Sequence, residues 1–106
     1  GEGAGRGANL NIPLPRGTGD AAYLEALGTA LARIAAFGAD AIVVALGLDA
    51  HENDPFKGLA ITTAGFAKIA AAIAAAGRPL LLVQEGGYLS EELSGNLESF
   101  LGGLGR

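Results

Sequence analysis

A carboxylate and an imidazole stand close together in one polar loop of the chain. Asp49 and His51 follow an apolar run at Ala41–Leu46. A carboxylate at the edge of such a run is partly desolvated, which is costly unless a cation or a donor pairs with it. Asp49 is therefore either a ligand of a divalent metal such as zinc or a cap on the backbone amides of its own turn. Position alone favours capping for Asp49 and an exposed, unliganded ring for His51, although the Asp-x-His spacing also allows two ligands to one metal. Asp54 before Pro55 is typical of a turn.

A phenol stands in a second loop, where Tyr88 follows Gly86 and Gly87. Two glycines let the backbone turn sharply and let a ligand approach closely. Tyr88 is then either a neutral donor to a developing oxyanion or an amphipathic ring that packs over the next helix with its hydroxyl in water. The sequence leaves both alternatives open.

Other chemistries have little support. The chain has no cysteine and one histidine, and it lacks a Gly-x-Ser-x-Gly motif, which disfavours Ser-His-Asp and Cys-His catalysis. The glycine-rich run Gly1–Gly7 precedes a predicted strand, whereas a dinucleotide-binding loop follows one. Nucleotide binding through this run is therefore a weak option.

Alternating strand and helix patterns position the two loops. Residues 9–14 alternate polar and apolar side chains, which predicts a half-exposed strand. The unbroken apolar runs Ala41–Leu46 and Pro79–Gln84 predict strands buried on both faces, as in a parallel sheet. Because parallel strands end at one edge of a sheet, we expect the Asp49 and Tyr88 loops to be neighbours there.

Three helices are predicted between and after these strands. The first covers residues 21–37, capped by Asp20 and ended by Gly38. The second is capped by Thr62 or Thr63 and ends near residue 76. The third is capped by Ser90, has an apolar stripe and ends at two glycines; these residues are Leu93, Leu97, Phe100, Leu101 and Gly102–Gly103.

The fold class predicted is therefore α/β, a mostly parallel sheet flanked by helices in three β-α units. Three strands make a small sheet of this class, and three helices cover two faces only thinly. The chain also begins with Gly. We expect the sheet to continue in polypeptide outside this sequence, and we find no internal domain boundary in residues 1–106.

Composition narrows the partners and the compartment. The chain has 106 residues, with seven Lys and Arg against eleven Asp and Glu, a net charge of −4. An acidic chain without a basic stripe is a poor binder of nucleic acid. No apolar run approaches the roughly 20 residues of a membrane span, and no secretory signal is visible. We therefore expect no nucleic-acid or membrane partner and a cytoplasmic location.

Taken together, the two loops resemble the histone deacetylase / acetylpolyamine amidohydrolase family, and its bacterial acetylpolyamine amidohydrolase branch most of all. The resemblance covers nearly the whole chain in order. Its motifs are the glycines and Asn-Ile-Pro-Leu within Gly3–Leu14, the run Gly47–Pro55, Leu59, residues 62–66 and Glu85–Tyr88.

This resemblance implies a larger arginase-like, three-layer α/β domain of which residues 1–106 are the C-terminal portion. It implies a zinc-dependent amide hydrolase that removes acetyl groups from acetylated polyamines or acetyl-lysine. By the resemblance, Asp49 is one of three zinc ligands, Tyr88 is the catalytic hydrogen-bond donor to the substrate carbonyl, and Gly86 and Gly87 line the acyl channel. His51 and Asp54 match loop positions that are not zinc ligands.

The chain departs from the family pattern because it holds a single histidine. The family's Asp-x-His ligand pair and its tandem histidines, the general base and acid, lie upstream of this region. Two zinc ligands must then come from residues absent here, and we expect this chain alone to be inactive. The sequence leaves open whether the chain forms a homodimer, as proteins of the bacterial branch commonly do. The alternative is a small non-catalytic α/β protein-interaction module with a complete core of its own.

Overall fold

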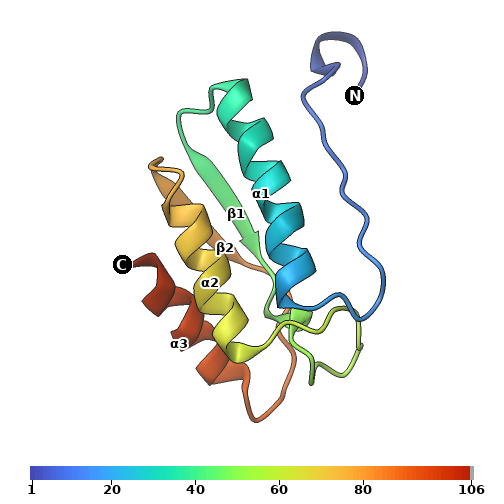
Figure 1. Ribbon diagram of the computed structural model, residues 1–106, viewed down its shortest axis with the longest axis vertical. Helices are drawn as coiled ribbons and strands as arrows, with labels where there is room; N and C mark the ends of the chain where they lie inside the picture. The colour runs from blue at the N-terminus through green and yellow to red at the C-terminus, as the bar shows by residue number, and fades with distance from the viewer. Residues whose placement is uncertain (106) are drawn as a thin grey trace.

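The computed structural model describes residues 1–105 as two parallel strands and three helices (Figure 1). Helix α1 is Asp20–Phe37, strand β1 is Ile42–Leu46, helix α2 is Thr63–Ala74, strand β2 is Leu80–Gln84 and helix α3 is Leu93–Leu104. The predicted α/β class with a parallel sheet is confirmed. None of the described helices is both long and apolar enough to cross a bilayer.

The two strands pair in register from Ile42 with Leu80 to Leu46 with Gln84. One face of the sheet carries Val44, Leu46 and Leu82 and packs against the helices. The core on this face is filled mainly by α2, with one aromatic ring from α3; its fully buried members from these helices are Phe66, Ile69, Ala70, Ile73 and Phe100.

The opposite face of the sheet is exposed. Val43, Leu81 and Val83 are 66%, 59% and 41% exposed, although each is a large apolar side chain. The prediction that both strands are buried on two faces is therefore wrong for this chain, because all three helices lie on one side of the sheet. The uncovered face is what a sheet shows when a second layer of the domain is missing.

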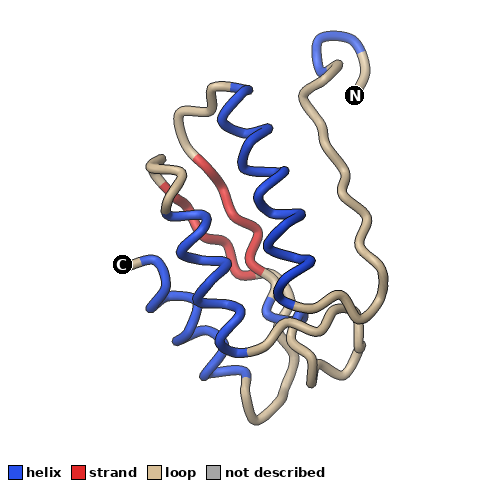
Figure 2. The backbone as a smooth tube through the Cα atoms, in the orientation of Figure 1, coloured by secondary structure: helices blue, strands red, loops and turns tan. Residues whose placement is uncertain are grey.

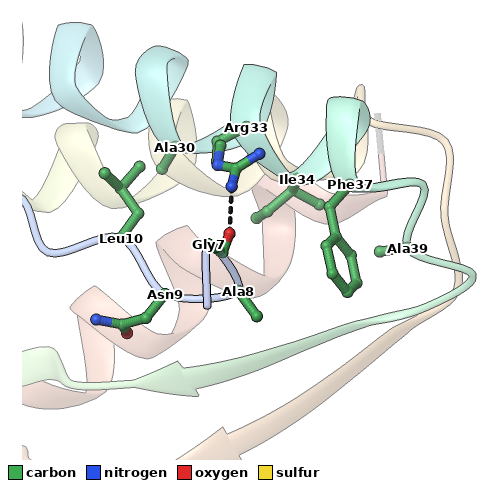
Figure 3. A pocket seen from close by; sticks show the side chains of 9 residues that line it. All are labelled: Gly7, Ala8, Asn9, Leu10, Ala30, Arg33, Ile34, Phe37 and Ala39. Atoms are coloured by element: carbon green, nitrogen blue, oxygen red, sulfur yellow. Dashed lines mark hydrogen bonds between the residues drawn. The ribbon is translucent and has the colours of Figure 1, made fainter. Parts of the chain in front are cut away.

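Residues 9–14 do not form the predicted third strand. They run extended beside α1 without pairing to β1 or β2. An alternating segment becomes a strand only when a neighbour supplies its hydrogen-bond partners. The Arg33 guanidinium donates to the Gly7 carbonyl, and a groove of about 260 Å³ remains between this segment and α1, lined in part by Leu10, Ile34 and Phe37 (Figure 3).

The start of α1 differs from the sequence prediction. Asp20 does not cap α1; its carboxylate accepts hydrogen bonds from the Thr62 backbone N–H at 2.9 Å and the Thr62 hydroxyl at 2.7 Å. Thr62 in turn accepts from the Gly65 N–H at 2.9 Å, so Thr62 is the cap of α2, as one of the two predicted alternatives has it. A Cβ at Gly65 would overlap the Asp20 carboxylate. The start of α1 is thereby tied to the start of α2.

The third helix begins later and ends later than predicted. Its N-cap is Glu92, without a side-chain cap bond, whereas Ser90 lies in the preceding turn. The helix continues through Gly102–Gly103. Gly103 is needed for helix packing and does not end the helix, because a side chain there would overlap the Ala67 carbonyl of α2. Leu101 points away from the core and is 49% exposed. Gly38 ends α1 at φ 77°, as predicted.

Candidate functional site

The loops that follow β1 and β2 meet at one end of the sheet (Figure 2). The Glu85 N–H donates to the Leu46 carbonyl at 2.8 Å, and the Leu48 N–H donates to the Gly86 carbonyl at 2.8 Å. The parallel pairing of the strands thus continues into the loops. Asp49 lies in the single 3₁₀ turn that follows, Leu48–Ala50.

The Asp49 carboxylate lies between two glycine backbones. A Cβ at Gly86 would overlap this carboxylate, and a Cβ at Gly47 would come within 2.5 Å of its Oδ1. Within residues 1–105 the carboxylate accepts no hydrogen bond, and the N-cap of its turn is Gly47, without a side-chain bond. Asp49 therefore does not cap its own turn, which removes the alternative that its position had favoured. A half-buried carboxylate with free oxygens remains next to Gly86.

His51 is buried, and its predicted exposure is wrong. Only 3% of its surface is exposed, and its ring stacks on Phe66 with the ring centres 6.3 Å apart. The Asn53 N–H donates to Nδ1 at 3.2 Å, and Nε2 lies 3.4 Å from the Thr63 hydroxyl. Both ring nitrogens are thus engaged inside the protein, and the ring is not offered to a metal beside Asp49.

Asp54 forms the turn that its place before Pro55 predicts. Its Oδ2 accepts from the Phe56 N–H at 2.8 Å, and its carbonyl accepts from the Lys57 N–H at 3.1 Å. The side chain is 3% exposed, so its role in this loop is to shape the backbone.

Tyr88 is 47% exposed, and its ring packs edge-on against Phe56 of the other loop, with centroids 4.8 Å apart at 69°. The contact that orients the ring therefore comes from the Asp49 loop. Gly87 has φ 153°, and a Cβ there would lie 3.3 Å from both Leu48 and Leu93. These restraints explain why two glycines precede the tyrosine.

A further side-chain bond joins the two loops. Asn53 Nδ2 donates to Glu92 Oε1 at 2.8 Å, and this hydrogen bond lowers the pKa of Glu92 below its ordinary value of 4.5. Sequence reasoning missed Asn53, Phe56 and Glu92, as well as Thr63 and Asn96. Each is ordinary in its local sequence, so the only signal was the general expectation that the two loops are neighbours.

Asp49 lacks a full set of metal-ligating side chains among the described residues. Within residues 1–105 no three His, Asp or Glu side chains are grouped so that they could hold a metal ion. A complete metal centre at Asp49 needs donors from polypeptide outside this chain, as the single histidine already indicates.

A parallel sheet with polar loops gathered at its strand ends is typical of α/β proteins, which bind ligands at that edge. The chain belongs to the histone deacetylase family: the histone deacetylase domain matches residues 1–104.

Within this family the chain is similar to acetylpolyamine amidohydrolases. It is 43% identical to that of Burkholderia pseudomallei (strain 1710b) over 105 residues, which are 99% of this chain and 31% of that protein. It is 46% identical to that of Mycoplana ramosa over 104 residues, 98% of this chain and 30% of that protein. The crystal structure of the acetylpolyamine aminohydrolase from Burkholderia pseudomallei superimposes with a TM-score of 0.95 at 42% identity, over 100% of this chain and 31% of that one. The chain thus spans about a third of the length of these relatives and is a partial domain.

Proposed function

We propose that this chain supplies one wall of the active site of a zinc-dependent deacetylase, with Asp49 as a zinc ligand and Tyr88 as the donor to the substrate carbonyl. One observation carries the proposal: the Asp49 carboxylate lies against Gly86, two residues before Tyr88, and accepts no hydrogen bond within residues 1–105. A half-buried carboxylate without a donor is stabilised when a cation binds it.

The chemistry of the donors fits zinc, which accepts carboxylate oxygen. Asp49 is the ligand that this chain would provide, and two further ligands and the general base belong to the missing part of the domain. Zinc, when bound, polarises the substrate carbonyl and lowers the pKa of its water. Gly47 and Gly86 lack the Cβ atoms that would overlap the Asp49 carboxylate, so the carboxylate fits between their backbones.

Tyr88 donates its phenolic proton in a hydrogen bond to the carbonyl oxygen, on which negative charge develops during amide hydrolysis. The edge-on contact with Phe56 limits the positions that the ring adopts. Gly86 and Gly87 are proposed to line the acyl channel with their backbone, while the space that a Cβ would take at each is filled by Asp49, Leu48 and Leu93. A donor of this kind is worth about 10²–10³ in turnover.

The proposed substrates are acetylated amines, either acetylated polyamines or acetyl-lysine. The names of the similar proteins favour polyamines. The net charge of −4 supports a cationic amine, because an acidic surface attracts it at long range.

The remainder of the domain is proposed to precede this chain and to cover the exposed sheet face at Val43, Leu81 and Val83. The same features count against a self-contained interaction module. Such a module needs a complete core, whereas α1 has no fully buried residue and a cavity of about 270 Å³ separates it from β1.

A chimera tests this proposal. In it, this chain replaces the segment that it matches in the Burkholderia pseudomallei enzyme, so that the relative supplies the missing two thirds of the domain. We expect the chimera to bind zinc and to release acetate from an acetylated polyamine or from an acetyl-lysine peptide. A chimera that folds with the melting temperature of its parent and hydrolyses neither substrate would contradict the proposal.

A further inference from the structure

A chain of partly buried hydrogen bonds starts at His51, two residues after Asp49, and reaches two helices. It runs from His51 to Thr63, the first residue of α2, and from Thr63 to Asn96 in α3. His51 and Asn96 are 3% and 1% exposed. We refer to these three side chains as the His51 relay.

The relay has one direction. Because the Asn53 N–H donates to Nδ1 of His51, that nitrogen presents its lone pair, and a neutral ring carries its proton on Nε2. Nε2–H then donates to the Thr63 hydroxyl at 3.4 Å, and the Thr63 hydroxyl donates its own proton to Asn96 Oδ1 at 2.7 Å. In this arrangement the proton on Nε2 and the proton of the Thr63 hydroxyl both have acceptors.

The buried amide of Asn96 gives the relay an energetic cost. Its Nδ2 is buried and has no partner among the described residues. An unpaired buried donor is unfavourable, and an apolar residue of similar size would avoid it. Its Oδ1, by contrast, is the end of the relay, which gives the residue a reason to be polar.

The relay connects both sides of the candidate site. On one side the His51 N–H closes the 3₁₀ turn of Asp49 by donating to the Leu48 carbonyl at 3.3 Å. On the other side α3, which carries Asn96, begins five residues after Tyr88. The Ser99 hydroxyl of α3 also donates to the Thr63 carbonyl at 2.6 Å, which fixes Thr63 against α3 a second time.

From this geometry we propose that His51 is a positioning residue: through Thr63 and Asn96 it holds the Asp49 turn in a fixed place relative to the Tyr88 loop. His51 touches neither substrate nor metal in this role. The inference rests on the proposed function, because positioning Asp49 matters only if Asp49 binds zinc. The orientation of the His51 ring and the protection of the Asp49 turn are measurable in the metal-free chain.

The first test is the tautomer of the ring, followed by ¹⁵N NMR on the full chain. Since His51 is the only histidine, its two ring nitrogens give the only imidazole signals. We expect the neutral ring to show Nδ1 as an unprotonated nitrogen and Nε2 as a protonated one, as the two hydrogen bonds of the ring require. An average of two tautomers, as in a solvated ring, in a chain whose amide spectrum shows it to be folded, would overturn the proposal.

The second test removes the middle of the relay. Thr63→Val deletes the hydroxyl at constant shape, and we expect amide exchange at Leu48 and Asn53 to rise roughly two- to tenfold, the effect of one hydrogen bond. Thr63→Ser, which keeps the hydroxyl, should restore protection. Thr29→Val makes the same change on an exposed face of α1 and should leave both amides unaltered.

Equal exchange in Thr63→Val and Thr29→Val would overturn the positioning role. A chimera that folds but hydrolyses neither substrate would contradict the proposed function instead and leave the tautomer and exchange results standing. The two ideas therefore fail separately.

Discussion

The Asp49 loop and the Tyr88 loop lie side by side at the end of the sheet but are built differently. The Asp49 loop is anchored by buried side chains, since Leu48, His51 and Asp54 are 2%, 3% and 3% exposed. In the Tyr88 loop, Tyr88 is 47% and Leu89 is 93% exposed. One half of the candidate site is thus fixed by this chain, and the other half is fixed at its ends and by one ring contact.

This difference indicates where the rest of the domain is needed. The anchors of the Asp49 loop come from α2 and α3, both of which belong to this chain. The exposed side of Tyr88 and the exposed sheet face at Val43 and Leu81 are the surfaces that the chain leaves uncovered. We expect mutations of the buried anchors of the Asp49 loop to lower stability, and mutation of the exposed Tyr88 to lower catalysis with stability unchanged.

The largest effect on catalysis within this comparison is expected from Tyr88→Phe. Loss of the phenolic donor should lower kcat of the chimera by about 10²–10³, with zinc content and melting temperature unchanged, because the ring is half-exposed and its contact with Phe56 survives. Steady-state kinetics measure this. Tyr23→Phe removes the other phenol of the chain, outside the site, and should retain kcat. Equal kcat in both variants would refute the role of Tyr88.

The matched pair Leu48→Ala and Leu89→Ala tests stability. Leu48→Ala should destabilise the chain by about 2–5 kcal/mol, because it leaves a cavity in the core. Leu89→Ala should stay within about 0.5 kcal/mol, since that side chain is 93% exposed. Denaturant unfolding measures both free energies. Similar losses in the two variants would show that the loops do not differ as described.

Gly86→Ala tests the contact at which the loops meet. The added Cβ would overlap the Asp49 carboxylate, so Asp49 must move. We expect zinc affinity of the chimera to fall roughly 10- to 100-fold, as when the support of a metal ligand is lost. Gly95→Ala, with open space around its added Cβ, is the control and should bind zinc normally. Unchanged affinity in Gly86→Ala would place the metal away from Asp49.

The smallest effect concerns the bond between Asn53 and Glu92. Because that bond lowers the pKa of Glu92 below 4.5 in the folded chain, its stabilisation is present above pH 4.5 and is lost as the pH falls through the lowered pKa. Asn53→Ala should raise the pKa of Glu92 towards 4.5, as followed by carboxyl ¹³C NMR. Asn11→Ala, in the exposed N-terminal segment, should not shift it. An unchanged titration in Asn53→Ala would mean that the loops are not joined there.

The sequence was informative wherever local patterns decide the structure. The apolar runs predicted both strands to within one residue at either end, and Gly38 and Thr62 marked helix ends correctly. Proximity of the two loops followed from parallel pairing alone. Asp49 and Gly86 do come together as that pairing predicts.

Predictions failed where a distant partner decides. His51 can be buried because the Thr63 hydroxyl accepts from its ring and in turn donates to Asn96. Both partners lie on later helices, so no local sequence pattern reveals them. Asp20 was predicted to cap its own helix, but its carboxylate accepts hydrogen bonds from Thr62 at the start of α2 instead. Residues 9–14 have a strand pattern without a strand beside them, since the partner that such a pattern requires is not among residues 1–105.

Zinc affinity of the chimera carrying Asp49→Asn, compared with Asp40→Asn, tests the central claim most directly. Both changes remove one negative charge, and Asp40 is an exposed residue just before β1. Loss of a direct ligand should exceed the roughly 10- to 100-fold cost of losing a supporting residue. We predict that Asp49→Asn weakens zinc binding more than about 100-fold while Asp40→Asn binds normally; equal affinity in the two variants would contradict the account.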